Sequence, residues 1–273
     1  MLTNGSQRWR DRRDSYRRPD EQIQTRRFDV ALIENDKTAK SFVEQHHYSA
    51  SYPVARRRFG LYESGSNDGD LVGVAVFSVP MNARSLNVFP GDHSLSAELG
   101  RFVLLDRVAG NGESWFLARC FELLRAKDWI GILSHSDPMP RLTADQKLIF
   151  PGHVGFCYQA HNAYYIGRST ARTMHLLPDG RVFSERCMSK IRAKEQGWQY
   201  SVNILRQFGA SEPDPDNLRA WLGYWLPRLT RKVYHPGNYR YVWALQKKYR
   251  SKLPPHLKYP KVTVRVEEAR KPL

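Results

Sequence analysis

The stretch Leu99-Gly-Arg-Phe-Val-Leu-Leu-Asp-Arg-Val-Ala-Gly-Asn-Gly112, together with the segment Glu113–Lys127 that follows it, decides the fold. The apolar residues of Leu99–Leu105 predict a buried strand, and a glycine-rich loop leads from it directly into a predicted helix. The apolar face of that helix is formed by Phe116, Leu117, Cys120, Phe121 and Leu124. The order of strand, glycine loop and helix predicts an α/β fold.

The glycine loop is suited to an anion. Gly110 and Gly112 allow the backbone to approach a ligand closely, and the unpaired N–H groups and dipole of the following helix favour negative charge. The alternative is a turn that only joins strand to helix. Glu113 at the helix start favours that alternative, because a carboxylate repels a pyrophosphate.

Further elements are predicted on both sides of this stretch. The expected strands are Phe28–Ile33, Arg58–Glu63, Leu71–Val79, Trp129–His135 and Tyr164–Gly167. The expected helices are Lys37–His46, with Asn35 or Asp36 as its cap, and Gly152–Ala160. This order predicts a mixed, mostly antiparallel sheet flanked by helices.

Length and composition limit the class of protein. The 273 residues, of which 41% are hydrophobic, allow one substantial core with appendages. The longest apolar run, Leu71–Pro80, is about half as long as a bilayer span requires, and no signal peptide opens the chain. We therefore expect a cytoplasmic protein with no membrane partner. Three cysteines without CxxC spacing argue against a disulfide framework or a cysteine-rich zinc site.

The net charge of +16 lies almost entirely at the two ends of the chain. Residues 1–27 hold eight basic and four acidic residues, residues 28–227 hold 22 and 21, and residues 228–273 hold 13 and two. Basic extensions on a balanced body are typical of proteins that neutralise nucleic-acid phosphates, although solubilising tails are the alternative. We predict a disordered basic arm (1–27), a catalytic domain (28–172), an accessory hairpin and helical unit that contacts DNA (173–227) and a basic C-terminal extension (228–273).

Two segments of the catalytic domain carry a family resemblance. The loop Arg107-x-x-Gly110-x-Gly112 and the segment from Gly155 through Tyr158 to Arg168 resemble those of acetyltransferases of the GNAT superfamily. The resemblance implies a GNAT-like fold in which the loop and helix start cradle the pyrophosphate of an acyl-CoA. It also implies a tyrosine that protonates the leaving group. The residues expected to bind the cofactor are Arg107, Gly110, Asn111 and Gly112.

A second resemblance covers roughly residues 40–245 and points to the Mom group of phage DNA-modifying proteins. The stretches that carry it are His47-Tyr48-Ser49, Glu98-Leu-Gly-Arg101-Phe, Glu113-Ser114-Trp-Phe-Leu-Ala-Arg119, Ser134-x-Ser136-Asp137-Pro138 and the Tyr158 segment. The founding member of that group adds a carbamoylmethyl group to N6 of adenine in DNA. The resemblance therefore implies a DNA adenine-modifying enzyme that acts in phage anti-restriction, in the cytoplasm of the host.

Arg101, Asp137 and Tyr158 are expected to carry chemistry. Arg101 interrupts an apolar strand, so it either pairs with a carboxylate such as Asp137 or grips a phosphate or carboxyl group of a substrate. Asp137 follows a buried strand at the sheet edge where ligands gather, and it either accepts a proton from the adenine amino group or caps a turn. Tyr158 either protonates the leaving group or packs as an aromatic residue with a satisfied hydroxyl.

Ser114 and the histidines complete the candidate site. Ser114, near the helix start, is expected to bind an anion or the donor, with helix capping as the alternative. His47 and Tyr48 are expected to line the acceptor pocket. Two imidazoles and a carboxylate would also suit non-haem iron, with chance spacing as the rival explanation. The residues that could supply such ligands are His46, His47, His135, Asp137 and His153.

Basic residues of the last hundred positions are the candidates for nucleic-acid contact. A hairpin formed by Thr173–Leu177 and Arg181–Phe183 precedes a helix that Ser184 caps and that runs to about Glu195. The predicted DNA contacts are Lys190, Arg192, Lys194, Arg231, Lys232, Arg240, Lys247 and Lys248. Interleaved aromatic residues between Arg228 and Arg250 suit base stacking, and a strand docked on the core is the alternative. For the helix, the alternative is a solvated face.

The donor is left open by the sequence. Glycyl and carbamoylmethyl substituents are isomers, so an acyltransferase could place an activated glycyl group on adenine N6 before a rearrangement. The donor would then be an activated glycine such as glycyl-tRNA, which makes tRNA a second partner, or else an acyl-CoA. Two rival functions stay open: an acyl-CoA-dependent N-acyltransferase on protein or tRNA, and a non-catalytic DNA-binding protein on a GNAT scaffold.

Overall fold

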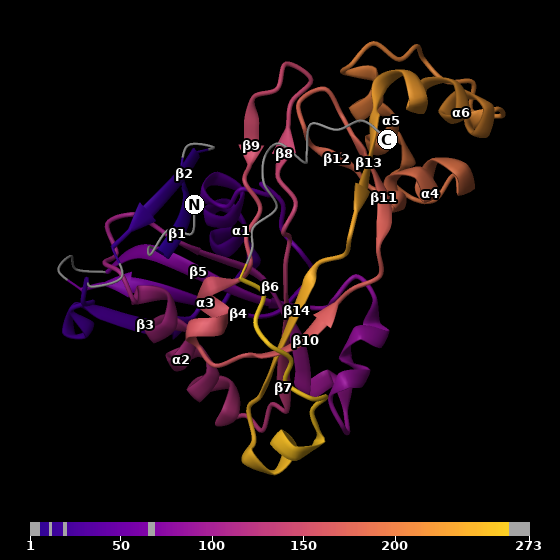
Figure 1. Cartoon of the computed structure of the whole chain (residues 1–273). Helices are drawn as coiled ribbons and strands as arrows, with labels where there is room; N and C mark the ends of the chain where they lie inside the picture. The colour runs from indigo at the N-terminus through magenta and orange to yellow at the C-terminus, as the bar shows by residue number, and fades with distance from the viewer. Residues whose placement is uncertain (1–5, 11–12, 19–20, 65–68, 262–273) are drawn as a thin grey trace. The chain divides into compact units, whose positions relative to one another are not determined.

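A computed structural model of the chain describes residues 6–10, 13–18, 21–64 and 69–261. Residues 1–5, 11–12 and 19–20 of the predicted arm, 65–68 of the predicted hairpin turn, and 262–273 of the predicted C-terminal extension lie outside the described residues. The chain divides into two compact units (Figure 1). Of the described residues, the first unit comprises those up to Pro138, His153–Arg168 and those from Asn238 onward, and the second comprises Met139–Gly152 and Ser169–Gly237.

A seven-stranded sheet forms the centre of the first unit, in the order β10-β14-β7-β6-β5-β4-β3. Its strands are β3 (Phe28–Leu32), β4 (Ala55–Glu63), β5 (Asp70–Ser78), β6 (Ser96–Leu104), β7 (Gly131–Ser136), β10 (Tyr164–Arg168) and β14 (Tyr239–Ala244). Every neighbouring pair is antiparallel except β6 and β7. The predicted mixed, mostly antiparallel sheet is therefore confirmed.

Helices cover both faces of this sheet. The helices of the unit are α1 (Asp36–His46), α2 (Gly112–Arg125) and α3 (Phe156–Ala160), with short 3-10 helices η1 (Thr25–Arg27), η2 (Ala83–Val88), η3 (His93–Leu95) and η4 (Lys247–Lys252). Val74 and Val76 of β5 pack with α1, whereas Ala75 and Phe77 pack with α2. Alternate residues of a strand point to opposite faces, so α1 and α2 lie on opposite sides of the sheet. The predicted cap of α1 is confirmed, because the side chain of Asn35 accepts a hydrogen bond from the Thr38 N–H at 3.1 Å.

Strand β14 lies inside the sheet, between β10 and β7. The sequence placed these residues in a basic C-terminal extension and left a strand docked on the core as the alternative. Tyr241 and Val242 are fully buried, so this part of the chain completes the core of the first unit. The pairing joins residues about one hundred positions apart along the chain, which local sequence pattern does not reveal.

In the described residues, the second unit has a three-stranded sheet (β12-β11-β13), a two-stranded sheet (β8-β9) and three helices. Its elements are β8 (Arg141–Leu142), β9 (Leu148–Phe150), β11 (Arg172–Leu176), β12 (Val182–Phe183), β13 (Arg231–His235), α4 (Glu185–Ala193), α5 (Trp198–Arg206) and α6 (Leu218–Leu229). Strand β11 pairs with both β12 and β13, and the predicted β11–β12 hairpin is confirmed. The predicted cap of α4 is also confirmed, because the Ser184 hydroxyl oxygen accepts from the Cys187 N–H at 3.2 Å. Phe183, Ile191, Leu205 and Leu222 are among the buried residues of a separate core.

The N-terminal segment forms an antiparallel hairpin of β1 (Ser6–Arg10) and β2 (Arg13–Arg17). The sequence predicted a disordered arm here, or one that orders on its partner. The polar, arginine-rich composition has no hydrophobic period to predict a strand, so the hairpin was not foreseeable from pattern. No helix in the described ranges is long and apolar enough to cross a membrane.

Gly131 tests how tightly the start of β7 is packed. A Cβ at this position would lie 2.2 Å from Cε1 of Phe89, and Phe89 is itself buried. We expect Gly131→Ala to lower the free energy of unfolding by about 1–3 kcal/mol because a buried aromatic ring must move. Urea denaturation measures this change.

The matched control is Gly223→Ala in α6, where no atom lies within 4 Å of the added Cβ. We expect that substitution to leave stability unchanged or to raise it by up to about 1 kcal/mol, since alanine is the better helix former. A Gly131→Ala protein as stable as its parent would contradict the packing at this position.

Candidate active site

The candidate site lies where β6 and β7 separate. The two strands pair in parallel over three residue pairs, from Ser96–Gly131 to Glu98–Leu133. Beyond Leu133, β7 runs along β14, while β6 continues along β5. The hydroxyl of Ser134 still donates a hydrogen bond to the Leu99 carbonyl at 3.3 Å. The residues that follow in the two strands, from Leu99 and from Ser134 onward, therefore do not pair with each other as parallel strands.

A bulge at Gly100 sets the direction of the side chains on β6. The pairing with β5 passes from Phe77–Leu99 to Val76–Arg101, so Gly100 is the extra residue. A Cβ on Gly100 would lie 2.3 Å from the Ser78 Oγ. A bulge shifts the alternation of a strand by one residue. Arg101 consequently lies close enough to Glu98 for the charge of that carboxylate to act on the pKa of Arg101.

Glu98 and His135 are joined by a hydrogen bond across the diverging strands. The Nδ1 of His135 lies 2.7 Å from Oε1 of Glu98, and about a fifth of each side chain is exposed. The sequence named His135 only as a possible metal ligand and did not single out Glu98. The available signal was an acidic residue within an apolar strand, three positions before Arg101.

Tyr158 is a buried residue of α3 whose hydroxyl is hydrogen-bonded to the side chain of Ser134. Its ring packs against Tyr241, with centroids 5.5 Å apart, and against Trp243 at 5.6 Å. Burial raises the pKa of Tyr158 well above its usual value, and Cys157, Tyr48 and Glu98 act in the same direction. The hydroxyl therefore keeps its proton at neutral pH.

Arg101 holds the loop that follows α1. Its Nε donates to the Ser51 carbonyl at 2.7 Å and its Nη2 donates to the Ser51 Oγ at 2.8 Å. Burial lowers the pKa of Arg101, while the nearby Tyr48, Glu98 and Tyr158 oppose that shift. The sequence predicted that Arg101 either pairs with a carboxylate or grips a substrate group. The structure places its guanidinium near the carboxylate of Glu98. Its hydrogen bonds to Ser51 position the loop that carries His47 and Tyr48.

A row of rings connects that loop with α3. The rings of His47 and Tyr48 have centroids 4.2 Å apart, and Tyr48 is followed by His153 at 6.3 Å. The ring of His153 in turn lies 6.4 Å from the ring of Tyr158. The backbone N–H of His153 donates to the backbone carbonyl of Asp137 at 2.8 Å. The structure thus brings together five of the six expected catalytic residues. The sixth, Ser114, lies in the first turn of α2, and none of the described contacts joins it to this row.

A sequence model of the Mom protein family matches residues 27–261, which include every residue of this cluster. The chain belongs to the Mom protein family. No curated protein matches the chain.

Among solved structures, the chain of this Mom family member is similar to a tandem GNAT protein from the clavulanic acid biosynthesis pathway (without AcCoA). The two are 10% identical with a TM-score of 0.41, and the match covers 80% of this chain and 99% of that one. A likeness of this size says nothing about the reaction of this chain.

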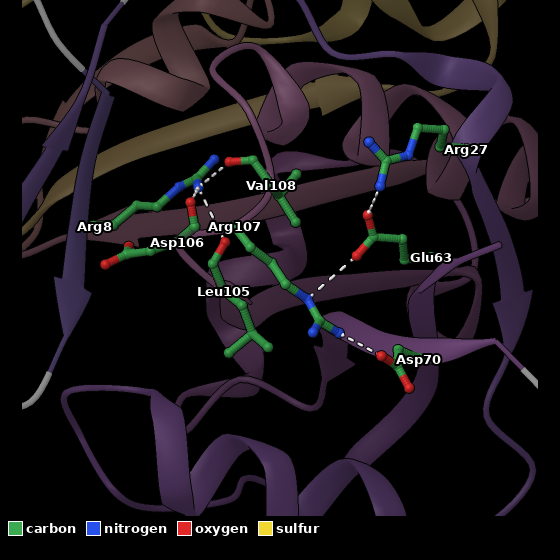
Figure 2. Close-up of polar contacts among 8 residues, drawn as sticks. All are labelled: Arg8, Arg27, Glu63, Asp70, Leu105, Asp106, Arg107 and Val108. Carbon is green, nitrogen blue, oxygen red and sulfur yellow. Dashed lines mark hydrogen bonds and ion pairs between the residues drawn. The ribbon is translucent and has the colours of Figure 1, made fainter. Parts of the chain in front are cut away.

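The glycine loop of the Mom family member is already bonded to its own chain. Arg107 lies 3.3 Å from a carboxylate oxygen of Glu63 and 3.1 Å from one of Asp70, as Figure 2 shows. The Gly110 N–H donates to the Glu21 carboxylate at 3.0 Å. Asn111, whose φ is 64°, donates through its side chain to the Glu21 carbonyl at 3.3 Å. The N–H of Gly112, the fourth residue expected to hold a cofactor, donates to the Ala109 carbonyl at 3.2 Å. These groups do not fit the pyrophosphate of an acyl-CoA, because each of the four is bonded to oxygen atoms of the protein.

A cavity of about 430 Å³ lies beside this loop. Its lining residues are Gln22, Gln24, Arg27, Phe28, Glu63, Arg107 and Ala109. Arg27 and Arg107 both bind Glu63, so part of their charge is neutralised within the wall of the cavity. Within the described residues, no three histidine, cysteine or carboxylate side chains are grouped in a way that could hold a metal ion.

The predicted nucleic-acid contacts fall into different settings. Lys190, Arg192 and Lys194 lie on or just after α4 in the second unit, where Arg192 pairs with Glu185 at 3.0 Å. Arg231 and Lys232 lie on β13, and Lys247 and Lys248 are exposed on η4. Arg240 lies within the central sheet and donates to a β10 carbonyl at 3.2 Å.

The aromatic residues between Arg228 and Arg250 are mostly buried. Tyr239, Tyr241 and Trp243 belong to the core of the first unit, so they do not offer free faces for base stacking. Tyr234 is 53% exposed and keeps that possibility. The alternative of a strand docked on the core is therefore the one that residues 239–244 adopt.

The thiol of Cys157, next to Tyr158 in the chain, makes the stability of the fold dependent on pH in the alkaline range. The pKa of Cys157 is raised to about 12, first by burial and then by the charge of Glu113. A thiol in the unfolded chain ionises near pH 8.5, whereas the folded protein holds Cys157 protonated to a higher pH. The contribution of Cys157 to the free energy of unfolding is therefore fully present below about pH 8.5 and is lost as the pH rises toward 12. We expect the free energy of unfolding to fall above that pH by up to about 1.4 kcal/mol per pH unit for this thiol.

Chemical denaturation at several pH values between 7 and 10 measures the slope. Cys157→Ala should show a shallower decline above pH 8.5 and the same dependence as the parent below it. Parallel curves for parent and variant across the whole range would contradict the raised pKa.

Proposed function

We propose that this Mom family member is a DNA-modifying transferase that places an acyl group on N6 of adenine. The observation that carries the proposal is the convergence of Glu98, His135, Arg101 and Tyr158 where β6 and β7 separate. Membership of the Mom family supports DNA as the substrate. The proposal assigns a role in the transfer to each of these side chains.

The acceptor is a weak nucleophile that needs a base. The lone pair of adenine N6 is delocalised into the ring, so a proton must leave the amine as the new C–N bond forms. His135 is the proposed base, because Glu98 holds its Nδ1 at 2.7 Å and thereby favours the tautomer whose Nε2 can take a proton. Asp137, which follows β7 directly, is proposed to orient the amine.

The leaving group needs an acid. Tyr158 is protonated at neutral pH and is proposed to give its proton to the leaving oxygen of an ester donor. In the balanced step, the N6–carbon bond forms, the ester C–O bond breaks, His135 gains the amine proton and the leaving oxygen gains the Tyr158 proton. Transfer through solvent then resets both residues. Arg101 supplies positive charge for the oxyanion that develops on the carbonyl.

The proposed donor is an activated glycyl ester, such as glycyl-tRNA. A glycyl group on N6 has the same atoms as a carbamoylmethyl group, so acyl transfer followed by rearrangement would yield that product. The target adenine must leave the base stack to reach buried groups such as Tyr158, at a cost of a few kcal/mol. His47 and Tyr48 are proposed to contact the extruded base, since their rings lie in the row that leads to Tyr158.

Mass spectrometry of nucleosides from cells that express the protein tests the function. We expect a modified deoxyadenosine with the parent protein, and a loss of about a hundredfold or more in Glu98→Gln and Tyr158→Phe, because general acid and base groups contribute that much. Tyr200→Phe, at an exposed tyrosine of the second unit, is the matched control and should keep the parent level.

Two results would overturn the proposal. Unmodified DNA in cells with well-folded parent protein would remove the transfer reaction. A modification that persists undiminished in both Glu98→Gln and Tyr158→Phe would remove these residues from it. If the biological effect persisted without any modified base, the non-catalytic DNA-binding alternative would replace the proposal.

DNA contact by the second unit has its own test. We propose that Lys190, Arg192 and Lys194 bind phosphates, each of which changes the salt dependence of the binding constant by about 0.9 in the logarithmic slope. Replacing all three by glutamine should reduce the slope by about 2–3, as measured by fluorescence anisotropy of labelled duplex DNA at several salt concentrations.

The control carries the same charge change on the first unit. Lys37, Lys40 and Lys127 are exposed there, and their joint replacement by glutamine should leave the slope nearly as in the parent. Equal slopes for the two triple variants would mean that net charge, and not these three residues, sets the affinity.

A further inference from the structure

Arg8 of the N-terminal hairpin reaches the glycine loop and is almost fully buried there. We infer that this loop is a guanidinium site, filled by the N-terminal segment of the same chain, and that it does not hold the pyrophosphate of a coenzyme. The inference concerns the donor side of the protein, and it stands whether or not adenine is the acceptor.

The loop presents its carbonyl oxygens to a cation. Nη1 of Arg8 donates to the Leu105 carbonyl at 3.1 Å and also to the Val108 carbonyl, and Figure 2 shows both bonds. Nη2 of Arg8 donates to the Ala109 carbonyl at 3.2 Å. A loop that binds phosphate must instead direct N–H groups at its ligand. The guanidinium of Arg8 lies among carbonyl oxygens, which we call the carbonyl cradle. The polarity of this cradle is opposite to that of a phosphate-binding loop.

A buried carboxylate completes the cradle. Oε1 of Glu113 lies 2.7 Å from Nε of Arg8, and the whole Glu113 residue is only 8% exposed. Its other oxygen, Oε2, is buried without a hydrogen bond among the described residues. This negative charge lies in the first turn of α2, where a coenzyme phosphate would have to bind. The like charges repel most strongly where water is excluded.

The N–H of Gly110 in the loop is also hydrogen-bonded to the N-terminal segment. The Glu21 carboxylate accepts from the Gly110 N–H at 3.0 Å, which is the contact that a phosphate oxygen would make. The backbone covers the same glycine, because a Cβ on Gly110 would lie 2.4 Å from the Arg18 carbonyl oxygen. Ile23 packs against the main core and lies 3.7 Å from a Cβ built on Gly112. The segment is thus fixed at both glycines.

Removal of the segment would not create a phosphate site. Without Arg8, the Glu113 carboxylate would remain in the first turn of α2 with its charge unpaired. The loop carbonyls would still point to the position that the guanidinium had left. The glycine loop is therefore a part of the fold that anchors the N-terminal segment, and the donor binds without it.

Titration of the full chain with coenzyme A by isothermal calorimetry is the first test. We expect no saturable binding up to about 1 mM coenzyme, for the parent and for Arg8→Ala alike. Saturable binding to the parent at micromolar concentration would overturn the inference. Binding that appears only in Arg8→Ala would also overturn it, because the segment would then be a removable cover over a functional coenzyme site.

Melting temperatures of the same proteins test the buried pair. Arg8→Ala should melt several degrees below the parent, and the double variant with Glu113→Gln should regain part of that loss because no unpaired charge remains. Arg26→Ala, at an exposed arginine of the same segment, should melt as the parent does. An unchanged melting temperature in Arg8→Ala would contradict the cradle.

Hydrogen exchange gives a readout that does not depend on substituting Arg8. Glu21→Ala should make the Gly110 amide exchange at least about tenfold faster, since the carboxylate that protects it is gone. Gln22→Ala, at the exposed neighbouring residue, should leave that rate unchanged. Equal exchange rates in Glu21→Ala and the parent would show that the segment does not occupy the loop in solution.

Discussion

The separation of β6 from β7 after three residue pairs is the constraint on which the rest of the first unit depends. A parallel pair that continued along both strands would hold Ser134 and His135 in a regular ladder against β6. The strands separate instead, with β5 holding one and β14 the other. The candidate site is therefore produced by strand pairing, and the side chains that line it are held from opposite sides by two antiparallel ladders.

Much of this architecture was predictable because it is local. Short apolar runs predicted the strands, and Asn35 and Ser184 marked the starts of two helices through hydrogen bonds within one turn. The glycine loop and the amphipathic helix α2 also followed from short-range pattern. The expected catalytic residues lie on predicted helices and strands or directly after them, and five of the six come together once the sheet has formed.

The parts that were not predictable depend on distant pairing or on a single irregularity. The bulge at Gly100 turns Arg101 toward Glu98, whereas regular alternation would have placed residues three apart on opposite faces. The Glu98–His135 pair joins positions 37 apart in the chain and depends on the parallel register of β6 with β7. The Arg8–Glu113 pair spans 105 positions, and the arginine-rich composition around Arg8 suggested solvent and not burial. Such a buried pair is costly to break, by about 3–5 kcal/mol when one partner is removed, so the N-terminal segment contributes to the stability of the fold.

The course of the chain between β10 and β14 has a consequence for variation of the protein. The chain leaves the central sheet after Arg168 and returns at Asn238, and β10 and β14 are adjacent, hydrogen-bonded strands. The two ends of the intervening segment touch, since a Cβ on Gly237 would lie 1.9 Å from the Ser169 carbonyl oxygen. An insertion whose ends meet imposes no length on the domain that carries it. The segment Ser169–Gly237 could thus differ in length without altering the strands that form the candidate site, since both of its ends would still meet beside β10 and β14.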